Sequence, residues 1–398
     1  MKNSDLIAEA DQAFATGELQ VGLEKLREHC ASQSADAGSW NRLAVIEEQI
    51  GDWSLAGRAH RQCIAAAPHI AASYVYAGYW FENDGNTDAA ASAYSLAQEC
   101  DPASLTVRAG HSAPANMRAQ AGNTLLRQFL SNHHRELFAD KVDCERIQEA
   151  IWPLTHDANF DYSESQFAPN LFYIPGLEKK PYYAAEQFDW SGVFTAGTND
   201  ITSELAAALE QKVAQSQLRP YLPENSISEG PLKELAGSLE WTALDLFKDG
   251  VENTDTSSLF PKTMALLDQV PLYALGEQPF EVFFSLLKPG QEIAPHYGQS
   301  NHALTVHLAL DVPPDCYLEV AGEQRQWQRG ELLIFDDSFL HSAHNQSSEL
   351  RIVLIFSVWQ PSLSSAEQEA IRLSFETRRD WMNARVGKLE YLLGHQAP

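Results

Sequence analysis

The segment ALTVHLALDV, residues 303–312, alternates between large aliphatic side chains and small or polar ones. A period of two places the two kinds on opposite faces of a β-strand, so the segment is predicted to be a half-buried strand. Similar short runs continue from about residue 280 to residue 359. Turn sequences separate them at Pro289-Gly290, Pro313-Pro314, Ala321-Gly322 and Arg329-Gly330. Short strands at this spacing are typical of a sandwich or a jelly roll.

His307 lies on the face of this predicted strand that carries the small residues Ala303, Thr305 and Ala309. A lone histidine in such a place is usually a hydrogen-bonded core residue. The small neighbours, however, also leave space beside the ring, which is compatible with a ligand cavity. Both interpretations stay open at this point.

The segment RIVLIFSVW, residues 351–359, predicts a strand that is apolar on both faces. Such a strand is covered on both sides, so Arg351 at its start is expected to be buried. An arginine is rarely buried without a partner, and its planar guanidinium suits a carboxylate held by two hydrogen bonds. The alternatives are an ion pair with Glu349, Asp336 or Asp337, and simple exposure at the start of the strand.

Two further histidines are candidate metal ligands. His296 follows a Pro-Gly turn in APHYG, and His341 ends FDDSFLH. Non-haem iron oxygenases commonly bind iron(II) through two histidines and one carboxylate. The carboxylate is expected two residues after the first histidine, where this chain has Gly298, so the triad is incomplete. Asp336 and Asp337 could orient the ligands or simply form a turn.

The first hundred residues repeat with a period of 34. The paired positions are Trp40 with Tyr74, Ala44 with Gly78, Gly51 with Gly85, Ala56 with Ala90, and Pro68 with Pro102; Leu6, Ala10 and Gly17 continue the register upstream. Thirty-four residues is the tetratricopeptide period, which predicts stacked helix–turn–helix units. An irregular helical bundle is the alternative.

The composition suits a packed globular protein, with 44% hydrophobic and 10% aromatic residues. A net charge of −26 opposes a broad phosphate-binding surface, so we expect no nucleic-acid partner. No apolar run approaches the roughly 18 residues of a membrane span, and we see no signal peptide. We therefore expect no membrane partner. Five cysteines without a C-x-x-C pair indicate a reduced, soluble, cytoplasmic protein.

These signals predict an α+β multidomain chain. We expect an all-α helical repeat array over residues 1–102, a helical connector over 103–167, a jelly roll flanked by helices over 168–362, and a C-terminal helix over 363–398 packed on the jelly roll. Ser364 and Glu367 form a capping box at the start of that last helix.

Four segments together resemble the aspartyl/asparaginyl β-hydroxylases, a family of iron(II)- and 2-oxoglutarate-dependent oxygenases. They are FSLLKPGQEIAPHYG (284–298), NHALTVHLALDVP (301–313), W-x-x-G-E-L-L-I-F-D-D-S-F-L-H (327–341) and RIVLIFSVWQP (351–361). LFYIPGL (171–177) and LFPKTMALLDQVP (259–271) are also similar to the family. The resemblance covers about residues 168–362 and implies a double-stranded β-helix oxygenase domain, to which some members add tetratricopeptide repeats.

The family binds iron through two histidines and has glycine in place of the third ligand. The resemblance therefore implies that His296 and His341 bind Fe(II). It implies that Arg351 and Ser285 hold the distal carboxylate of 2-oxoglutarate and that His307 contacts the carboxylate near the metal. The implied reaction uses dioxygen to hydroxylate an unactivated C–H bond, of the Asp/Asn β-hydroxylation type, on a peptide or protein side chain that the repeats could hold.

Two positions depart from the family's pattern. Members usually carry arginines in L-R-x-H, where this chain has Ala303 and Thr305. The arginine at the second position helps to hold carboxylates of the substrate and the cosubstrate, so its loss argues against an acidic Asp side chain as substrate. The alternatives are an oxygenase acting on a small molecule, a halogenase with chloride at the vacant position, and a catalytically inactive scaffold that binds no iron.

Overall fold

The computed structural model describes residues 2–32, 35–148, 172–224, 226, 230 and 232–395. The chain divides into two compact units, Met1–His134 with Thr377–Pro398, and Arg135–Glu376. The expected domain start at residue 168 and the end of the expected connector lie outside the described residues. The boundaries at residues 102 and 362 remain predictions.

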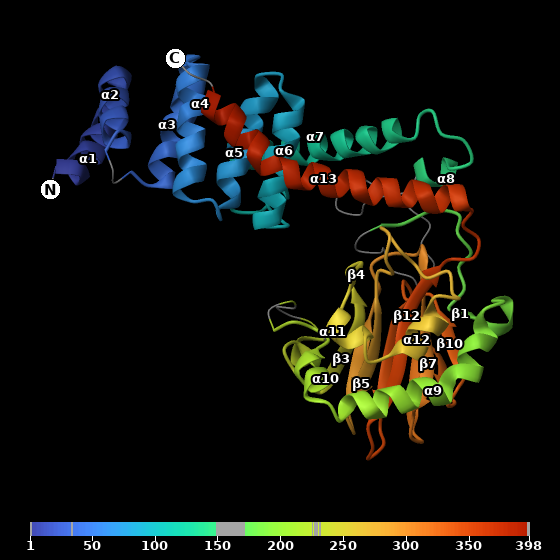
Figure 1. Ribbon diagram of the computed structural model, residues 1–398. Coiled ribbons are helices and arrows are strands. Elements are labelled where there is room, and N and C mark those ends of the chain that lie inside the picture. Colours follow the sequence, from blue (N-terminus) through green and yellow to red (C-terminus); the bar gives the residue numbers. More distant parts are fainter. Residues whose placement is uncertain are drawn as a thin grey trace. The chain divides into compact units, whose positions relative to one another are not determined.

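Three helix–turn–helix pairs begin the first unit (Figure 1). They are α1 (Lys2–Ala15) with α2 (Leu19–Cys30), α3 (Ala37–Ile50) with α4 (Trp53–Ala66), and α5 (Ala71–Asn83) with α6 (Thr87–Cys100). The turn inside each pair contains a glycine with φ between 79° and 84°: Gly17, Gly51 and Gly85. Only glycine adopts this conformation without strain. These turns recur every 34 residues, which confirms the predicted helical array.

Two longer helices complete the first unit, α7 (Ala113–Leu137) and the last part of α13 (Ser365–His395). Ser364 and Glu367 form the predicted capping box, because each backbone N–H donates to the other's side-chain oxygen, at 2.9 and 3.2 Å. Residues 377–395 of this helix belong to the first unit, where Arg385 donates to Glu99 and Ser95 of α6. The expected packing of the helix on the jelly roll stays a prediction.

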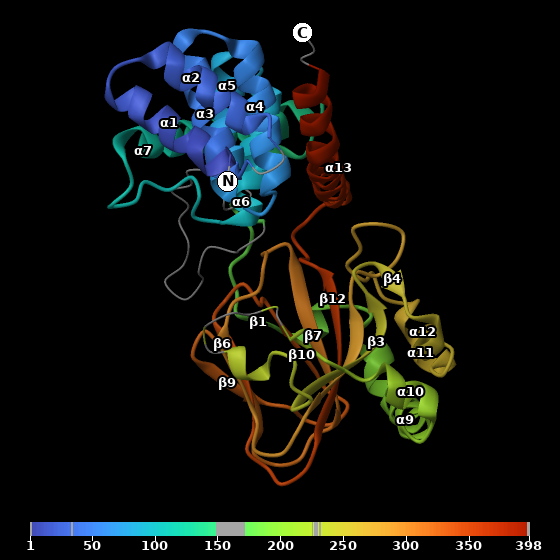
Figure 2. The same cartoon turned by 90° about the vertical axis from the view of Figure 1, so that its left-hand side faces the viewer.

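Two antiparallel sheets form the second unit (Figure 2). The larger has the order β1-β10-β7-β12-β5-β3-β2, with β4 paired to β3, and the smaller has the order β6-β11-β8-β9. The strands are β1 (Tyr182–Tyr183), β2 (Arg219–Pro220), β3 (Trp241–Lys248), β4 (Val251–Glu252), β5 (Val282–Leu287), β6 (Glu292–His296), β7 (Ala303–Asp311), β8 (Cys316–Val320), β9 (Glu323–Gln326), β10 (Leu332–Phe335), β11 (His341–Asn345) and β12 (Arg351–Trp359). From β5 to β12 the chain crosses repeatedly between the two facing sheets, with β8 and β9 consecutive in the smaller sheet, and β12 lies between β5 and β7 in the larger one. This is the predicted jelly-roll topology.

Four helices, of which α9 is the longest, lie over the outer face of the larger sheet (Figures 1 and 2). They are α9 (Ser191–Leu209), α10 (Lys212–Gln217), α11 (Thr254–Ser257) and α12 (Pro261–Leu267), and a single turn, α8 (Glu145–Gln148), precedes the sheets. The aliphatic face of β7 packs against Phe194 and Ile201 of α9 in one buried cluster. This leaves the face with Thr305 and His307 toward the smaller sheet, as the alternation predicts.

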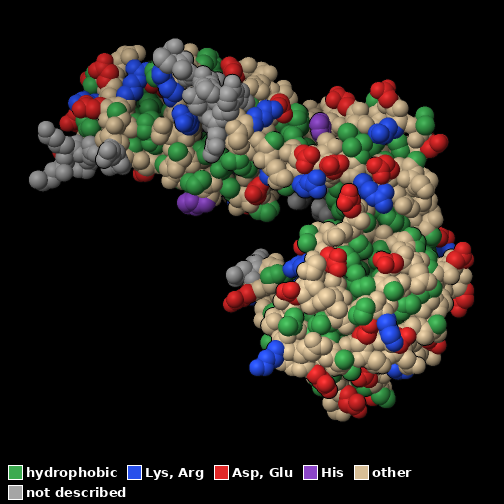
Figure 3. Space-filling view, in the orientation of Figure 1, with side chains coloured by type: hydrophobic (Ala, Val, Ile, Leu, Met, Phe, Trp, Pro, Cys, Tyr) green, Lys and Arg blue, Asp and Glu red, His purple; other side chains and the backbone are tan. Residues whose placement is uncertain are grey.

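Acidic side chains are spread over the visible face of each unit (Figure 3), in agreement with the net charge of −26. All five cysteines are free thiols. Among the described residues, no helix has the length and apolar character needed to cross a membrane.

Candidate active site

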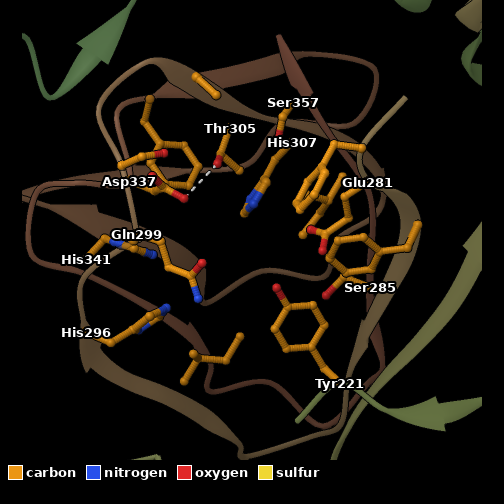
Figure 4. Close-up of a pocket in the computed structure, with 18 of the residues that line it drawn as sticks. Tyr221, Glu281, Ser285, His296, Gln299, Thr305, His307, Asp337, His341 and Ser357 are labelled. Atoms are coloured by element: carbon orange, nitrogen blue, oxygen red, sulfur yellow. Dashed lines mark hydrogen bonds between the residues drawn. The ribbon is translucent and has the colours of Figure 1, made fainter. Parts of the chain in front are cut away.

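A cavity of about 400 Å³ opens between the two sheets of the second unit (Figure 4). All five side chains singled out in the sequence line it: Ser285, His296, His307, His341 and Arg351. They come from β5, β6, β7, β11 and β12, so the jelly roll gathers them from both sheets.

His296 and His341 face each other as directly paired residues of β6 and β11. Their ring centroids are 4.1 Å apart. In each ring Nδ1 lies within hydrogen-bond distance of a backbone carbonyl oxygen two residues earlier, Ala294 O at 2.8 Å and Phe339 O at 2.9 Å. This contact favours the tautomer in which Nδ1 donates, so the lone pair is on Nε2.

Burial is the largest cause that lowers the pKa of both imidazoles to about 4, and the charge of His341 contributes to the low pKa of His296. Both rings are therefore neutral at physiological pH, which is the form that binds a metal. Two converging neutral imidazoles suit one divalent ion such as iron(II). Within the described part of the chain, no group of three or more His, Cys, Asp and Glu side chains is arranged to hold a metal.

The space beside Gly298, where a third ligand is expected, is filled by the carboxylate of Asp337. A Cβ on Gly298 would lie 2.3 Å from Asp337 Oδ1. The Gly298 N–H donates to the Asp337 carbonyl oxygen at 2.7 Å, and Thr305 Oγ1 donates to Oδ2 at 3.2 Å (Figure 4). Burial raises the pKa of Asp337 to about 6, so this group is mostly ionised at neutral pH. A carboxylate thus lies beside the histidine pair, but residue 337 supplies it.

The neighbouring Asp336 lies in a turn and does not line the cavity. Its carboxylate is buried and accepts the backbone N–H of Ser338 at 2.9 Å, which is a turn contact. Burial raises its pKa to about 8. The sequence left open whether the two aspartates form a turn or support the site. Asp336 belongs to the turn, and Asp337 lines the cavity.

Arg351 is 1% exposed and has no acidic partner among the described residues. Its Nη1 donates to Ser285 Oγ at 3.3 Å, its Nε has no partner, and its guanidinium lies 5.2 Å from the ring of Trp327. Burial lowers its pKa to about 10, which still leaves it charged at neutral pH. The expected alternatives, an internal ion pair or exposure, are both wrong.

Ser285 lies beside the Arg351 guanidinium. Its Oγ accepts from Arg351 and also from Trp241 Nε1, at 3.1 Å. A hydroxyl that accepts twice keeps its own hydrogen for donation. Arg351 and Ser285 together therefore offer donors to a carboxylate and contain no anion of their own.

His307 lies near both groups, because charges on Arg351 and His341 each contribute to lowering its pKa. Burial is the larger cause, and it holds the imidazole neutral. The ring packs parallel to Trp327 and edge-on to Phe335, and Nδ1 has no hydrogen-bond partner. It is therefore not the satisfied core histidine that the sequence left open.

Glu281 and Tyr221 also line the cavity and were not among the site residues predicted from the sequence. Tyr221 stacks on Trp241 with ring centroids 4.1 Å apart and on Phe283 at 5.1 Å. Glu281 precedes β5 and shares the inward face with Phe283 and Ser285. The same period of two that directs Ser285 inward would have identified it.

The strand order and the paired histidines define a jelly-roll protein with a candidate metal centre. Residues 195–361 match the model of the family described as aspartyl/asparaginyl beta-hydroxylase. The human aspartyl/asparaginyl beta-hydroxylase is 26% identical over 206 residues, which are 51% of this chain and 26% of that protein. Aspartate beta-hydroxylase domain-containing protein 2 of Xenopus tropicalis is 31% identical over 217 residues, 53% of this chain and 55% of that protein.

Over residues 195–361, this domain is therefore similar to the aspartyl/asparaginyl β-hydroxylase family. The chain spans about half or less of the length of these two relatives. A solved Pseudomonas putida prolyl-4-hydroxylase aligns over 46% of this chain and 90% of its own, at 13% identity and a TM-score of 0.25. The jelly-roll assignment rests on the strand order and not on that alignment.

Proposed function

We propose that this protein is an iron(II)- and 2-oxoglutarate-dependent dioxygenase that hydroxylates an unactivated C–H bond. The observation that carries the proposal is a buried guanidinium without an anion, Arg351, in the same cavity as two neutral imidazoles. An unpaired buried charge is unfavourable unless an anionic ligand joins it. 2-Oxoglutarate has one carboxylate for Arg351 and a second, with the adjacent keto oxygen, for a metal.

His296 and His341 would hold the iron through Nε2, and the backbone carbonyls at Nδ1 fix the orientation of both rings. When bound, iron(II) supplies the activation of dioxygen that couples decarboxylation of 2-oxoglutarate with oxygen insertion into the substrate. Arg351 and Ser285 bind the distal carboxylate and so orient the cosubstrate. His307 donates a hydrogen bond to the carboxylate near the metal. Apolar side chains, among them Ile293, Leu318 and Phe335, limit the access of water.

Asp337 fills the space beside Gly298, where a third ligand is expected. Its carboxylate accepts from Thr305. The same negative charge disfavours chloride at that position. Hydroxylation is therefore favoured over halogenation.

The relatives are named for Asp/Asn β-hydroxylation. We propose the same C–H hydroxylation chemistry here, with a peptide or protein side chain as the substrate. Helical repeat arrays present extended surfaces on which a polypeptide can lie. We propose that the reaction takes place in the reducing cytoplasm, since all five cysteines are free.

The test is conversion of 2-oxoglutarate to succinate by purified protein with iron(II). His296→Ala and His341→Ala should each abolish turnover. His344→Ala is the matched control, because this histidine lies on the same strand as His341 but stacks on Tyr317 outside the cavity. Normal turnover in both ligand variants would refute the assignment. Wild-type protein that neither binds iron nor gains thermal stability from 2-oxoglutarate would favour the inactive scaffold.

A further inference from the structure

Residues that lie side by side on adjacent strands form one level of the larger sheet. One such level faces the cavity near the histidine pair. Thr305 of β7 pairs with Ser357 of β12, and Glu281 directly precedes Val282, which pairs with Phe356. Thr305, Ser357 and Glu281 therefore lie side by side, and all three side chains line the cavity (Figure 4). With about 4.8 Å between adjacent strands, Thr305 and Glu281 are about 10 Å apart.

The Glu281 carboxylate is half-buried and lies across the cavity from His296 and His341 (Figure 4). Among the described residues it has no hydrogen-bond or ion-pair partner. A nearby cation, Arg219, is already engaged, since it donates to both oxygens of Asp245, at 2.5 and 2.8 Å, and to two backbone carbonyls. Burial raises the pKa of Glu281 to about 7, which is consistent with a carboxylate that lacks a counter-ion.

The other charges of the site balance without Glu281. The distal carboxylate of 2-oxoglutarate would neutralise Arg351. The near carboxylate and Asp337 would balance the two charges of the metal. Glu281 and the exposed Asp249, which also lines the cavity, would remain without a cation.

Thr305 and Ser357, the neighbours of Glu281 on this level, are both uncharged, and the Thr305 hydroxyl already donates to Asp337. The fixed charge that this level presents to the cavity is therefore the negative one of Glu281.

Aromatic side chains flank this carboxylate. The negative charge of Glu281 is the largest cause of the raised pKa of the Tyr221 hydroxyl, so the two side chains are close. Tyr221 in turn stacks on Trp241. A carboxylate beside aromatic rings is the environment that binds guanidinium and ammonium groups.

We propose that the substrate carries a cationic group that binds at Glu281, with the arginyl or lysyl side chain of a peptide as its source. The inference rests on the proposed function and names its substrate class. In the reaction, one C–H bond of the cationic substrate becomes C–O–H. Dioxygen is reduced, and 2-oxoglutarate is oxidised to succinate and CO2, so atoms and electrons balance.

The test compares four blocked tripeptide amides, Gly-X-Gly, in which X is arginine, its neutral isostere citrulline, aspartate or asparagine. The readouts are stimulation of 2-oxoglutarate turnover and a product heavier by one oxygen atom, expressed as kcat/KM. The arginine peptide should exceed the citrulline peptide by about 10-fold or more, the effect of one hydrogen bond to a charged group. Aspartate should be the poorest. Free argininamide separates a peptide from a small-molecule source.

Glu281→Gln should bring the arginine-to-citrulline ratio close to one. Glu331→Gln is the matched control, because this exposed carboxylate lies outside the cavity, and it should keep the ratio. A preference for aspartate or asparagine, or an unchanged ratio in Glu281→Gln, overturns the proposal. Failure of the proposed function appears separately, as absence of iron binding and of peptide-independent turnover. In that case, equal affinities of the arginine and citrulline peptides in a binding assay overturn the inference.

Discussion

Replacing Arg351 by methionine separates ligand binding from stability. In the ligand-free protein this guanidinium makes one long hydrogen bond, at 3.3 Å, and is 1% exposed. Its removal takes an unpaired charge out of the interior, so the free energy of unfolding should stay the same or rise by about 1 kcal/mol. Binding of 2-oxoglutarate should instead weaken by about 3 kcal/mol, or roughly 100-fold, because the distal carboxylate loses a charged partner.

The assay is thermal unfolding of metal-loaded protein without oxygen, as 2-oxoglutarate is added. Wild-type protein should gain stability with concentration, and Arg351→Met should not within the same range. Arg219→Met is the contrasting variant, because it leaves the Asp245 carboxylate buried without its partner. It should lower the free energy of unfolding by about 3 kcal/mol and keep the response to 2-oxoglutarate. A ligand-free Arg351→Met protein that is strongly destabilised and still responds normally would show that Arg351 is structural.

Three further substitutions test other contacts. Gly298→Ala should destabilise the protein by about 1–3 kcal/mol through its clash with Asp337, and Asp337→Ala should rescue it; denaturant unfolding that shows additive effects would contradict this. The pKa of Glu281 is about 7 in the folded protein against an ordinary 4.5, so the stability this group contributes is full below about pH 4.5 and is lost as the pH rises through 7. Glu281→Gln should therefore melt on the order of 2–4 °C above wild type at about pH 8, and at the same temperature as wild type near pH 4.5. A gain in melting temperature that does not depend on pH would contradict the raised pKa of this carboxylate. Gly51→Ala should cost about 1 kcal/mol in chemical unfolding, because φ is 84°, whereas no loss would show that the turn relaxes.

Local patterns predicted much of the fold and site. The period of two fixes which side chains of β5, β7 and β12 share a face, and so it directs Ser285, His307 and Arg351 to one side. The capping box at Ser364 likewise depends on residues three positions apart. Such features follow from backbone geometry within a few residues.

Contacts that depend on the strand order could not be predicted from local sequence patterns. Glu281 and Thr305 lie on one level only because β12 separates β5 from β7. Asp337 reaches the space beside Gly298 through a contact across 39 positions of the chain. Local sequence also could not show that Arg385 would hold the end of α13 to Glu99.

Anaerobic titration with iron(II), with and without 2-oxoglutarate, tests the central claim most directly. The pairing of His296 with His341 and the unpartnered Arg351 predict one ion per chain, bound more tightly when 2-oxoglutarate is present, and no saturable binding in His296→Ala. Binding that survives the loss of either histidine, or that 2-oxoglutarate does not strengthen, would contradict the account.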